Sequence, residues 1–338
     1  MNSNYYDVSI IIVTFNSIEY IANCIESILK QNLAKEIIIV DNCSVDGTVD
    51  FVLQHYPQVK AIKSPFNGGY GMGNNLGVSH ASSENIIIIN PDTIMEDNSI
   101  ESLVKSLSED KNVISAPKIL TYDGFQINSA GLINHFTGLG FTRGYGECPD
   151  KYMSPEFLNG VGGTCFAIRK SHFIDLGGFD ESFFMYREDG DLCWRVHLMN
   201  MSIKYVPMAI IRHDYFLNVS PLKLYNIERG RYFILRKYYS FVDFLVLFPS
   251  LILVEFLSWG YAFKLGHRGI YYKMKSIIDG FTTKVTRVRG DKNNLLAHLN
   301  ENIPVNLLSC NKIDRTLRCI FNKIFVWNFS LIKFKYNL

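Results

Sequence analysis

The sequence predicts an α/β protein with a mostly parallel sheet flanked by helices, followed by a C-terminal helical region. β-branched runs such as Val8–Thr14 alternate with stretches in which apolar residues recur at helical spacing, as in parallel sheets whose strands are buried on both faces. The charge balance reverses past the middle of the chain, and a strongly apolar stretch follows. We therefore expect one domain over residues 1–218 and a second region over 219–338, with a role in membrane association or oligomerisation.

The composition excludes several classes of protein. The chain has 338 residues, of which 48% are hydrophobic and 20% charged, which does not fit a disordered protein, a collagen or a small disulfide-stapled module. The seven cysteines are scattered, with no C-x-x-C spacing, and are typical of reduced thiols. The start of the chain has no signal-peptide pattern, so we expect a cytoplasmic protein.

The two parts of the chain carry opposite charge. Residues 1–203 hold 13 lysines and arginines against 24 aspartates and glutamates, whereas residues 204–338 hold 21 against 8. An acidic part suits a site that collects metal ions and the phosphorylated ligands they bind. A basic, aromatic-rich part suits an anionic surface, either lipid headgroups or nucleic acid.

The expected elements follow one another as β-α units. After the first strand, apolar residues at helical spacing over 18–29 indicate a helix, and Asn16 with Glu19 resembles a capping box at its start. The glycine-rich stretch 121–157 is expected to form loops or an antiparallel excursion over a ligand. The other predicted strands are 36–40, 59–63, 86–89 and 202–211, and the other predicted helices are 45–55, one starting at 73–81, and one opening at Glu188.

Small or polar residues follow each of the first four strands. These strand ends read Thr14-Phe15-Asn16, Asp41-Asn42, Asn67-Gly68-Gly69 and Asn90-Pro91-Asp92. Each could be a turn, but together they offer what a nucleotide needs: amides or carboxylates for base and ribose, and glycines for close backbone approach. A dinucleotide-binding fold is excluded, because the turn after the first strand contains no glycine.

Two further groups of residues could carry chemistry. Asp92, at the end of an all-isoleucine strand, could bind a divalent cation that bridges two phosphates, and His213 could return as a second ligand or be a hydrogen-bonded structural residue. Glu188, Asp189 and Asp191 open a helix, where the dipole favours ionised carboxylates. One of them could act as a general base towards an alcohol, or all three could simply cap the helix.

Five stretches of the chain form an ordered set of motifs: VSIIIVTFN, VDN at 40–42, N-x-G-x-G at 67–71 followed by NN-x-G, NPD at 90–92, and GGFDESFFMYREDGDLCWR. This set resembles the motifs of inverting family 2 glycosyltransferases with the GT-A fold. The resemblance covers about residues 7–215 and is closest to the rhamnosyltransferase-like subgroup that builds bacterial surface polysaccharides. It implies a nucleotide-sugar donor and a divalent cation, Mg²⁺ or Mn²⁺.

Position by position, the resemblance implies these roles. Asp189 would be the catalytic base, and Asp92 would hold the cation, with His213 as a further ligand. Asn90 stands where the family's metal motif often has a carboxylate, so we expect modest or partial metal dependence. Contacts to the nucleoside would come from Thr14, Asn16, Asp41, Asn67 and Asn75, and contacts to the acceptor or donor sugar from Gly163, Glu188 and Asn90.

The stretch 241–263 is apolar, but Asp243, Pro249 and Glu255 interrupt it, and its longest uncharged run, 244–254, is shorter than the roughly 18–20 residues of a spanning helix. Asp243, Ser250 and Ser258 fall on one helical face, and basic residues flank both ends. This pattern favours a helix in the plane of the membrane interface. A buried core helix or a dimer helix remains the alternative.

The sequence therefore predicts a cytoplasmic enzyme, peripheral on the inner membrane face, that transfers a sugar, with dTDP-rhamnose as the expected donor, to a lipid-linked glycan. A homo-oligomer is left open. One rival is a catalytically silent sugar- or nucleotide-binding subunit. The other, nucleic-acid binding by the basic region, is disfavoured because the apolar run 244–254 has no use in a wet, phosphate-binding groove.

Overall fold

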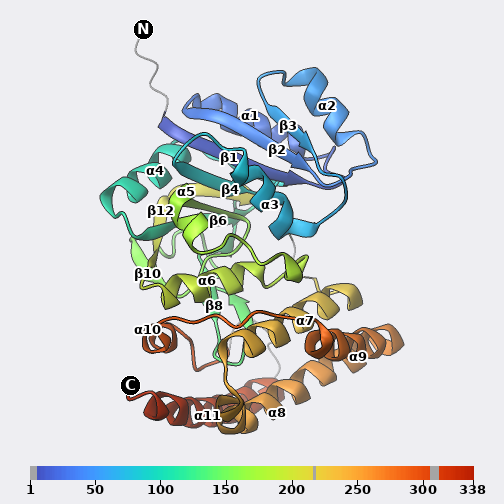
Figure 1. Ribbon diagram of the computed structural model, residues 1–338, viewed down its shortest axis with the longest axis vertical. Helices are drawn as coiled ribbons and strands as arrows, with labels where there is room; N and C mark the ends of the chain where they lie inside the picture. The colour runs from blue at the N-terminus through green and yellow to red at the C-terminus, as the bar shows by residue number, and fades with distance from the viewer. Residues whose placement is uncertain (1–5, 216–217, 305–311) are drawn as a thin grey trace. The chain divides into compact units, whose positions relative to one another are not determined.

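The computed structural model describes residues 6–215, 218–304 and 312–338, with the side chains of 312–315 left out (Figure 1). The chain forms two compact units. Unit 1 comprises Met1–Leu132, Thr142–Val196 and Met201–Phe216, and unit 2 comprises Ile133–Phe141, His197–Asn200 and Leu217–Leu338.

Unit 1 is built on a ten-stranded sheet in the order β10-β12-β6-β11-β4-β1-β2-β3, with β5 paired to β12 and β7 paired to β6. The pairs β1–β2, β1–β4, β2–β3 and β6–β12 are parallel, which confirms the predicted α/β class. Strand β11 runs antiparallel to both β4 and β6 in the middle of the sheet. The main strands are β1 (Tyr6–Thr14), β2 (Ala34–Asp41), β3 (Lys60–Lys63), β4 (Asn85–Ile89), β5 (Thr93–Met95), β6 (Val113–Thr121), β11 (Cys165–Arg169) and β12 (Ser202–His213).

Helices cover both faces of this sheet. Ile10 and Ile12 of β1 belong to one buried apolar cluster and Ile11 to another, because successive side chains of a strand point to opposite faces. This burial on both faces explains why the strand is an unbroken run of β-branched residues. The helices of unit 1 are α1 (Ile21–Gln31), α2 (Thr48–His55), α3 (Gly69–Ser79), α4 (Ser99–Glu109), α5 (Lys170–Asp175) and most of α6 (Glu188–Leu198).

Some expectations about elements were wrong. Helix α4 and strand β6 were not predicted, and α3 begins at Gly69 rather than at Gly73. Helix α1 begins at Ile21 without a side-chain cap, so the capping box at Asn16 does not form. The stretch 121–157 is an antiparallel excursion, with the short strands β7 (Ile127–Ser129), β8 (Leu132–Asn134), β9 (Gly140–Thr142) and β10 (Glu156–Leu158).

The described part of unit 2 is largely helical. Helix α7 (Pro221–Tyr238) packs on α9 (Gly266–Thr282), and α8 (Phe241–Lys264) packs on both α9 and α11 (Lys312–Lys335); α10 (Lys292–Ala297) is short. Ser240 and Asp243 form a capping box that starts α8. By length and composition alone, α8 is a helix that could cross a membrane.

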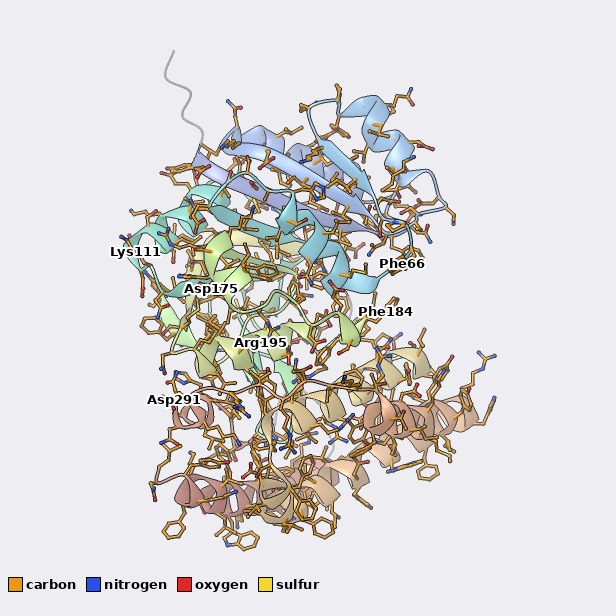
Figure 2. The ribbon with its side chains drawn as sticks, in the orientation of Figure 1. Phe66, Lys111, Asp175, Phe184, Arg195 and Asp291 are labelled. Atoms are coloured by element: carbon orange, nitrogen blue, oxygen red, sulfur yellow. The ribbon has the colours of Figure 1, made fainter. Side chains whose placement is uncertain are left out.

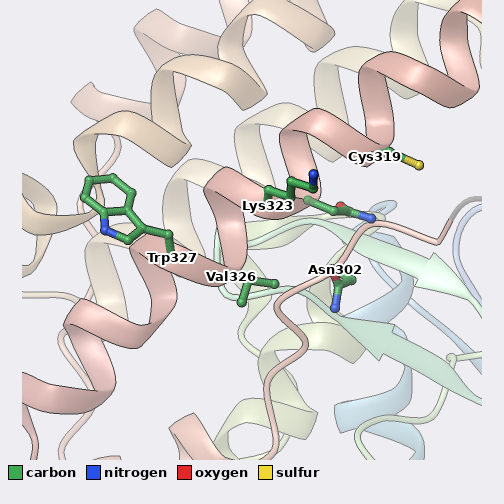
Figure 3. A pocket seen from close by; sticks show the side chains of 6 residues that line it. Asn302, Cys319, Lys323, Val326 and Trp327 are labelled. Atoms are coloured by element: carbon green, nitrogen blue, oxygen red, sulfur yellow. The ribbon is translucent and has the colours of Figure 1, made fainter.

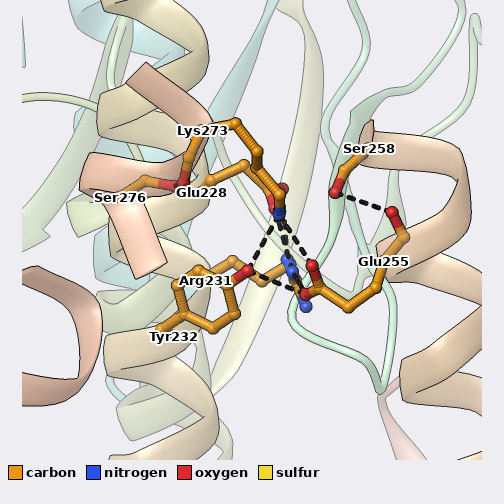
Figure 4. Close-up of polar contacts among 7 residues, drawn as sticks. All are labelled: Glu228, Arg231, Tyr232, Glu255, Ser258, Lys273 and Ser276. Carbon is orange, nitrogen blue, oxygen red and sulfur yellow. Dashed lines mark hydrogen bonds and ion pairs between the residues drawn. The ribbon is translucent and has the colours of Figure 1, made fainter. Parts of the chain in front are cut away.

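A buried cluster of charged side chains joins α7, α8 and α9 (Figure 4). Arg231 donates to Glu228, with Nη2 at 2.9 Å from Oε2, and also to Glu255. Lys273 Nζ lies 2.9 Å from Glu255 Oε2, also binds Glu228, and donates to Tyr232 Oη at 2.8 Å. Burial alone would raise the pKa of Glu228, but the charges of Arg231 and Lys273 lower it to about 2. The described cluster thus pairs two cations with two carboxylates.

Candidate functional site

A cavity of about 280 Å³ lies in unit 1 where the parallel strands end. It receives residues from the turns after β1, β2, β3 and β4, because the carboxyl ends of parallel strands meet at one edge of a sheet. Of the residues predicted to bind donor, metal or sugar, Thr14, Asn16, Asn67, Asn90 and Asp92 line it. The other described lining residues are Val13, Phe15, Ser17, Tyr20, Asn42, Gly69, Tyr70, Pro91 and Met185.

Asp41 supports the cavity wall through Thr14. Thr14 Oγ1 donates to Asp41 Oδ1 at 2.9 Å, and the hydroxyl and backbone N–H of Ser44 donate to the same carboxylate. Asn16 adopts a left-handed backbone conformation (φ 53°), and its Oδ1 accepts from Val45 N at 2.9 Å. These bonds tie the turn after β1 to the turn after β2, so the edge of the cavity is held in shape.

Asn67 and Asn75, two predicted nucleoside contacts, bind backbone in this structure. Asn67 Oδ1 accepts from Gly69 N at 3.0 Å and so closes an Asx turn just before α3. Asn75 does not line the cavity: its amide exchanges hydrogen bonds with the backbone of Phe179 and also donates to Glu181. Asn75 thus anchors the segment that leads to α6.

Sequence reasoning missed Asn42 and Tyr70 as site residues. Asn42 Nδ2 donates to Gly69 O, while its buried Oδ1 has no hydrogen-bond partner. Tyr70 Oη donates to Gly163 O at 2.5 Å. Asn42 was placed at a strand end that suits a nucleotide, or a turn, but was not named as a contact, and Tyr70 stands inside a run of glycines, where no spacing rule marks an aromatic residue.

Strand pairing brings Asp92 and His213 together. β5 pairs antiparallel with β12, with Thr93 opposite His213, and Asp214 N donates to Asp92 O. Asp92 Oδ1 lies 3.3 Å from His213 Nε2, and both atoms are buried without a hydrogen-bond partner. The two ligand-type atoms face each other at ion-pair distance and have no hydrogen-bond partner, an arrangement that fits a shared cation.

The other side of the histidine ring supports this assignment. Asn128 Nδ2 donates to Tyr215 O, which turns Asn128 Oδ1 towards His213 Nδ1 at 3.3 Å. An Nδ1–H that donates to this oxygen leaves Nε2 with its lone pair, the form that binds metal. The described residues contain no group of three potential protein ligands, so a cation here would take its remaining ligands from phosphate and water.

Asp189 stands at the first turn of α6 and is partly exposed. Its Oδ2 accepts from Gly163 N at 3.1 Å and its Oδ1 from Gly190 N at 2.6 Å, bonds that suit a carboxylate anion. Burial and the charge of Asp189 raise the pKa of the adjacent Glu188 to about 8. Glu188 therefore favours its protonated form at neutral pH, while the Asp189 carboxyl is held by two backbone N–H donors.

Asp189 and Asp92 both act electrostatically on Tyr215. The pKa of Tyr215 is raised to about 12, first by burial, then by neighbouring tyrosines and by the charges of Asp189 and Asp92. Tyr70, which lines the cavity, likewise has its pKa raised by burial and then by Glu188 and Asp189. Geometry links the two groups: Tyr70 lines the cavity with Asp92 and donates to Gly163 O, and Gly163 N donates to Asp189. All the predicted residues named here belong to unit 1.

The start of α3 contacts the loop before α6, where Phe184 is labelled in Figure 2. Tyr70 N donates to Phe184 O at 2.8 Å, and Gly69 has φ +81°. A Cβ at Gly69 would lie 2.0 Å from Phe184 O. Only glycine therefore allows this backbone approach.

We expect Gly69→Ala to destabilise unit 1 more than Gly47→Ala. Gly47 has φ +89° with nothing near its Cβ position, so alanine there adds only conformational strain, about 1–2 kcal/mol. Gly69→Ala adds a clash worth about 1–3 kcal/mol more. Urea unfolding of the two variants measures the difference, and equal midpoints would contradict the contact between Gly69 and Phe184.

A second cavity, of about 340 Å³, lies in unit 2 against α11 (Figure 3). The described residues that line it are Asn302, Cys319, Asn322, Lys323, Val326 and Trp327, and none of these six is acidic. It therefore lacks a carboxylate such as Asp92, which lines the first cavity.

The comparison with protein families decides the identity of the fold. The profile described as glycosyl transferase family 2 matches residues 9–177, half of the chain. The chain belongs to glycosyl transferase family 2. A second profile, described as the N-terminal domain of galactosyltransferase, matches residues 148–217 of this family 2 chain and so includes α6 with Asp189.

Curated relatives are similar over the same part of the chain. The hexosyltransferase Agl10 of low-salt glycan biosynthesis in Haloferax volcanii is 29% identical over 205 residues, 58% of this chain and 64% of that protein. Rhamnosyltransferase WbbL of Escherichia coli is 27% identical over 59% of this chain and 80% of that protein. The Mycobacterium tuberculosis N-acetylglucosaminyl-diphospho-decaprenol L-rhamnosyltransferase is 28% identical, over 52% of this chain and 66% of that protein.

Solved structures confirm the GT-A-type fold. Staphylococcus aureus TarS 1–349 superposes with a TM-score of 0.54 at 16% identity, covering 98% of this chain and 91% of that one. GalNAc-T7 in complex with UDP, GalNAc and Mn²⁺ gives a TM-score of 0.58 at 18% identity, covering 74% of this chain and 52% of that one. The predicted family, fold class and rhamnosyltransferase-like resemblance are confirmed.

Proposed function

We propose that this chain is an inverting hexosyltransferase that moves a sugar from a nucleoside diphosphate donor to a hydroxyl of a lipid-linked glycan. Rhamnose is the sugar to test first, because two of the relatives are named rhamnosyltransferases and one of these acts on a diphospho-decaprenol. The observation that carries the proposal is the pair formed by Asp92 Oδ1 and His213 Nε2, which face each other 3.3 Å apart without a hydrogen-bond partner, beside a cavity lined by amides.

We assign the following roles to the residues of the site. Asn16, Asn42 and the turn capped by Asn67 would hold the nucleoside, and Thr14 with Asp41 would keep that wall in place. Asp92 and His213 would hold Mg²⁺ or Mn²⁺, which when bound neutralises charge on the leaving diphosphate. Two structural relatives were solved with Mn²⁺ and a nucleotide or nucleotide sugar, which supports the cation but not its identity.

Asp189 would act as the base. It takes the proton of the acceptor hydroxyl while that oxygen forms a bond to the anomeric carbon, from the face opposite the diphosphate. The bond between the anomeric carbon and the phosphate oxygen breaks, and its electron pair leaves with the nucleoside diphosphate. Configuration at the anomeric carbon is therefore inverted. The protonated Glu188 and the partly exposed Gly163 would face the sugars.

The place of reaction follows from the acceptor. We infer that the enzyme works at the cytoplasmic face of the membrane, with residues 1–218 as the transferase domain and 219–338 as the region that contacts the bilayer. A sugar acceptor anchored by a polyprenyl tail can reach Asp189 only if the enzyme stays close to the lipid surface. This inference predicts no affinity for nucleic acid.

Asp92→Asn should weaken binding of the preferred nucleoside diphosphate about tenfold in the presence of Mn²⁺ and leave metal-free binding unchanged, because one anionic ligand is lost. Thermal-shift titration with dTDP, UDP and GDP, with and without Mn²⁺, measures this, since a ligand at about 100 times its Kd stabilises by about 2.7 kcal/mol. Asp97→Asn, an exposed carboxylate paired with Lys30, is the matched control. Metal dependence that survives in Asp92→Asn would contradict the assignment.

A further inference from the structure

Helix α8 exposes an apolar side and buries polar residues, the opposite of a surface helix in a soluble protein. Most of its large apolar side chains lie on the exposed side, including Phe256 with 68% and Phe263 with 61% of its surface accessible, although Leu247 and Val254 are buried. The polar residues Asp243 and Ser250 on the opposite side are fully buried. A soluble helix buries its apolar stripe and exposes its polar one. The exposed apolar residues of α8 are Phe241, Val242, Leu245, Phe248, Ile252, Phe256, Tyr261 and Phe263.

Buried polar groups hold α8 in this orientation. Pro249 interrupts the hydrogen-bond ladder, and the amide of Asn328 on α11 inserts beside it, donating to Val246 O and accepting from Ser250 N. Asp243 accepts from Lys335 at 2.5 Å and from Lys292 at 3.1 Å. Rotating α8 to bury its aromatic residues would break all of these bonds.

The neighbouring helices repeat the pattern. On α9 the exposed residues Tyr271, Met274 and Ile278 follow helical spacing, while Lys273 and Ser276 are buried. On α11, Trp327 and Phe334 are exposed, and Trp327 borders the cavity of Figure 3. Since α8 packs against both α9 and α11, the three helices carry exposed apolar stripes within one unit.

Acidic and basic side chains of α8 and α9 lie in different places. Each of their three carboxylates is engaged inside the unit: Asp243 with Lys292 and Lys335, Glu255 with Arg231 and Lys273, and Asp279 as acceptor for Tyr225 Oη. The exposed charged residues of these two helices are basic, namely Lys264, Arg268 and Lys275. The exposed surface is therefore apolar and cationic.

We propose that the exposed stripes of α8, α9 and α11 insert into an anionic lipid bilayer, with the helices lying along its surface. Aromatic and aliphatic side chains next to lysines and arginines are the pattern of interfacial helices. Each basic residue near the headgroups adds electrostatic attraction. This inference deepens the proposed function, because it names the surface that would bring unit 2 to a lipid-anchored acceptor.

The same contacts argue against a spanning α8. A spanning helix needs an apolar surface along its length or polar residues that face other spanning helices. One flank of α8 is occupied by the side chains that bind Asp243, in its first turn, and Glu255, well inside the helix. Only the other flank is available to lipid, which is the condition for a helix embedded to about 5–10 Å. The fully buried core helix is likewise not what the structure shows.

Vesicle flotation of the full-length protein tests the proposal. We expect binding to vesicles of phosphatidylglycerol and phosphatidylcholine, and at least about tenfold weaker binding to phosphatidylcholine alone or at high salt. Replacing Phe248, Ile252 and Phe256 with serine should reduce the bound fraction to background. These side chains are exposed, so the fold should persist, which circular dichroism checks.

The matched control is serine at Phe125, Phe157 and Met208, three exposed apolar residues of unit 1. Full binding by this control with loss in the α8 variant supports the proposal; equal binding by both overturns it. A second copy of the chain as the occupant would appear as a lipid-independent dimer in analytical ultracentrifugation that the α8 variant dissociates, without vesicle binding, and would also overturn it.

Nucleotide titration separates this inference from the proposed function. If the α8 variant loses vesicle binding but keeps its metal-enhanced nucleoside diphosphate shift and its transfer to a detergent-solubilised acceptor, the lipid surface alone is affected. If the wild-type protein binds no nucleoside diphosphate but still floats with the vesicles, the proposed function fails and the lipid surface stands.

Discussion

Asp189→Asn should lower the rate of sugar transfer by about 10²–10⁴-fold while leaving the affinity for nucleoside diphosphate unchanged. The amide keeps the size of the side chain and can still accept from Gly163 N, but it cannot take a proton from the acceptor. Initial rates with a nucleotide sugar and a prenyl-diphosphate acceptor measure the first effect, and thermal-shift titration measures the second.

Asp175→Asn is the matched control for this experiment, because Asp175 is an exposed carboxylate at the end of α5 (Figure 2). It should transfer sugar at the wild-type rate. An Asp189→Asn variant that keeps a rate close to that of Asp175→Asn would remove Asp189 from the mechanism and direct attention to Glu188, the other carboxyl of the pair. Loss of nucleotide binding together with transfer would indicate a structural role instead.

Lys273→Met should destabilise unit 2 by about 3–5 kcal/mol. The change removes one of two buried cations, so Glu228 and Glu255 would then share Arg231 (Figure 4). A buried carboxylate without its partner retains the desolvation penalty that the pair had offset. Guanidinium unfolding followed by tryptophan fluorescence suits this test, because Lys273 Nζ lies 6.0 Å from the ring centre of Trp259.

Lys275→Met provides the comparison on the same helix. Lys275 is exposed two residues further along α9, so the same substitution there should change the free energy of unfolding by no more than about 0.5 kcal/mol. Equal stability of the two variants would mean that the buried cluster contributes nothing beyond a surface lysine. Both measurements are made without lipid, so that the exposed surface of α9 does not enter the result.

Much of the candidate site could be predicted because it depends on local order. A parallel strand ends where its β-branched run ends, and the next residue reaches the edge of the sheet whatever the remainder of the chain does. Thr14, Asn16 and Asp92 were placed in this way and do lie at one cavity. The order of the motifs then sufficed to identify the family.

The pairing of distant segments could not be predicted in the same way. The approach of His213 to Asp92 depends on the register between β5 and β12, and the contact of Tyr70 with Gly163 depends on how α3 packs near β11. Asn75 shows the opposite case, since the family resemblance implied a nucleoside contact there, yet its amide binds the backbone of Phe179. Such roles depend on partners about a hundred residues away.

The sequence by itself determined the class of the sheet, the order of the strand ends, the acidic and basic parts of the chain, and the single polar face of α8. Only the tertiary structure decided that this face points inward. A helical stripe of Asp243, Ser250 and Ser258 is compatible with water, lipid headgroups or protein, because periodicity fixes which residues share a face but not what covers it. The partners of Asp243 on α10 and α11, Lys292 and Lys335, come from the far end of the chain, and their charges hold that carboxylate inside.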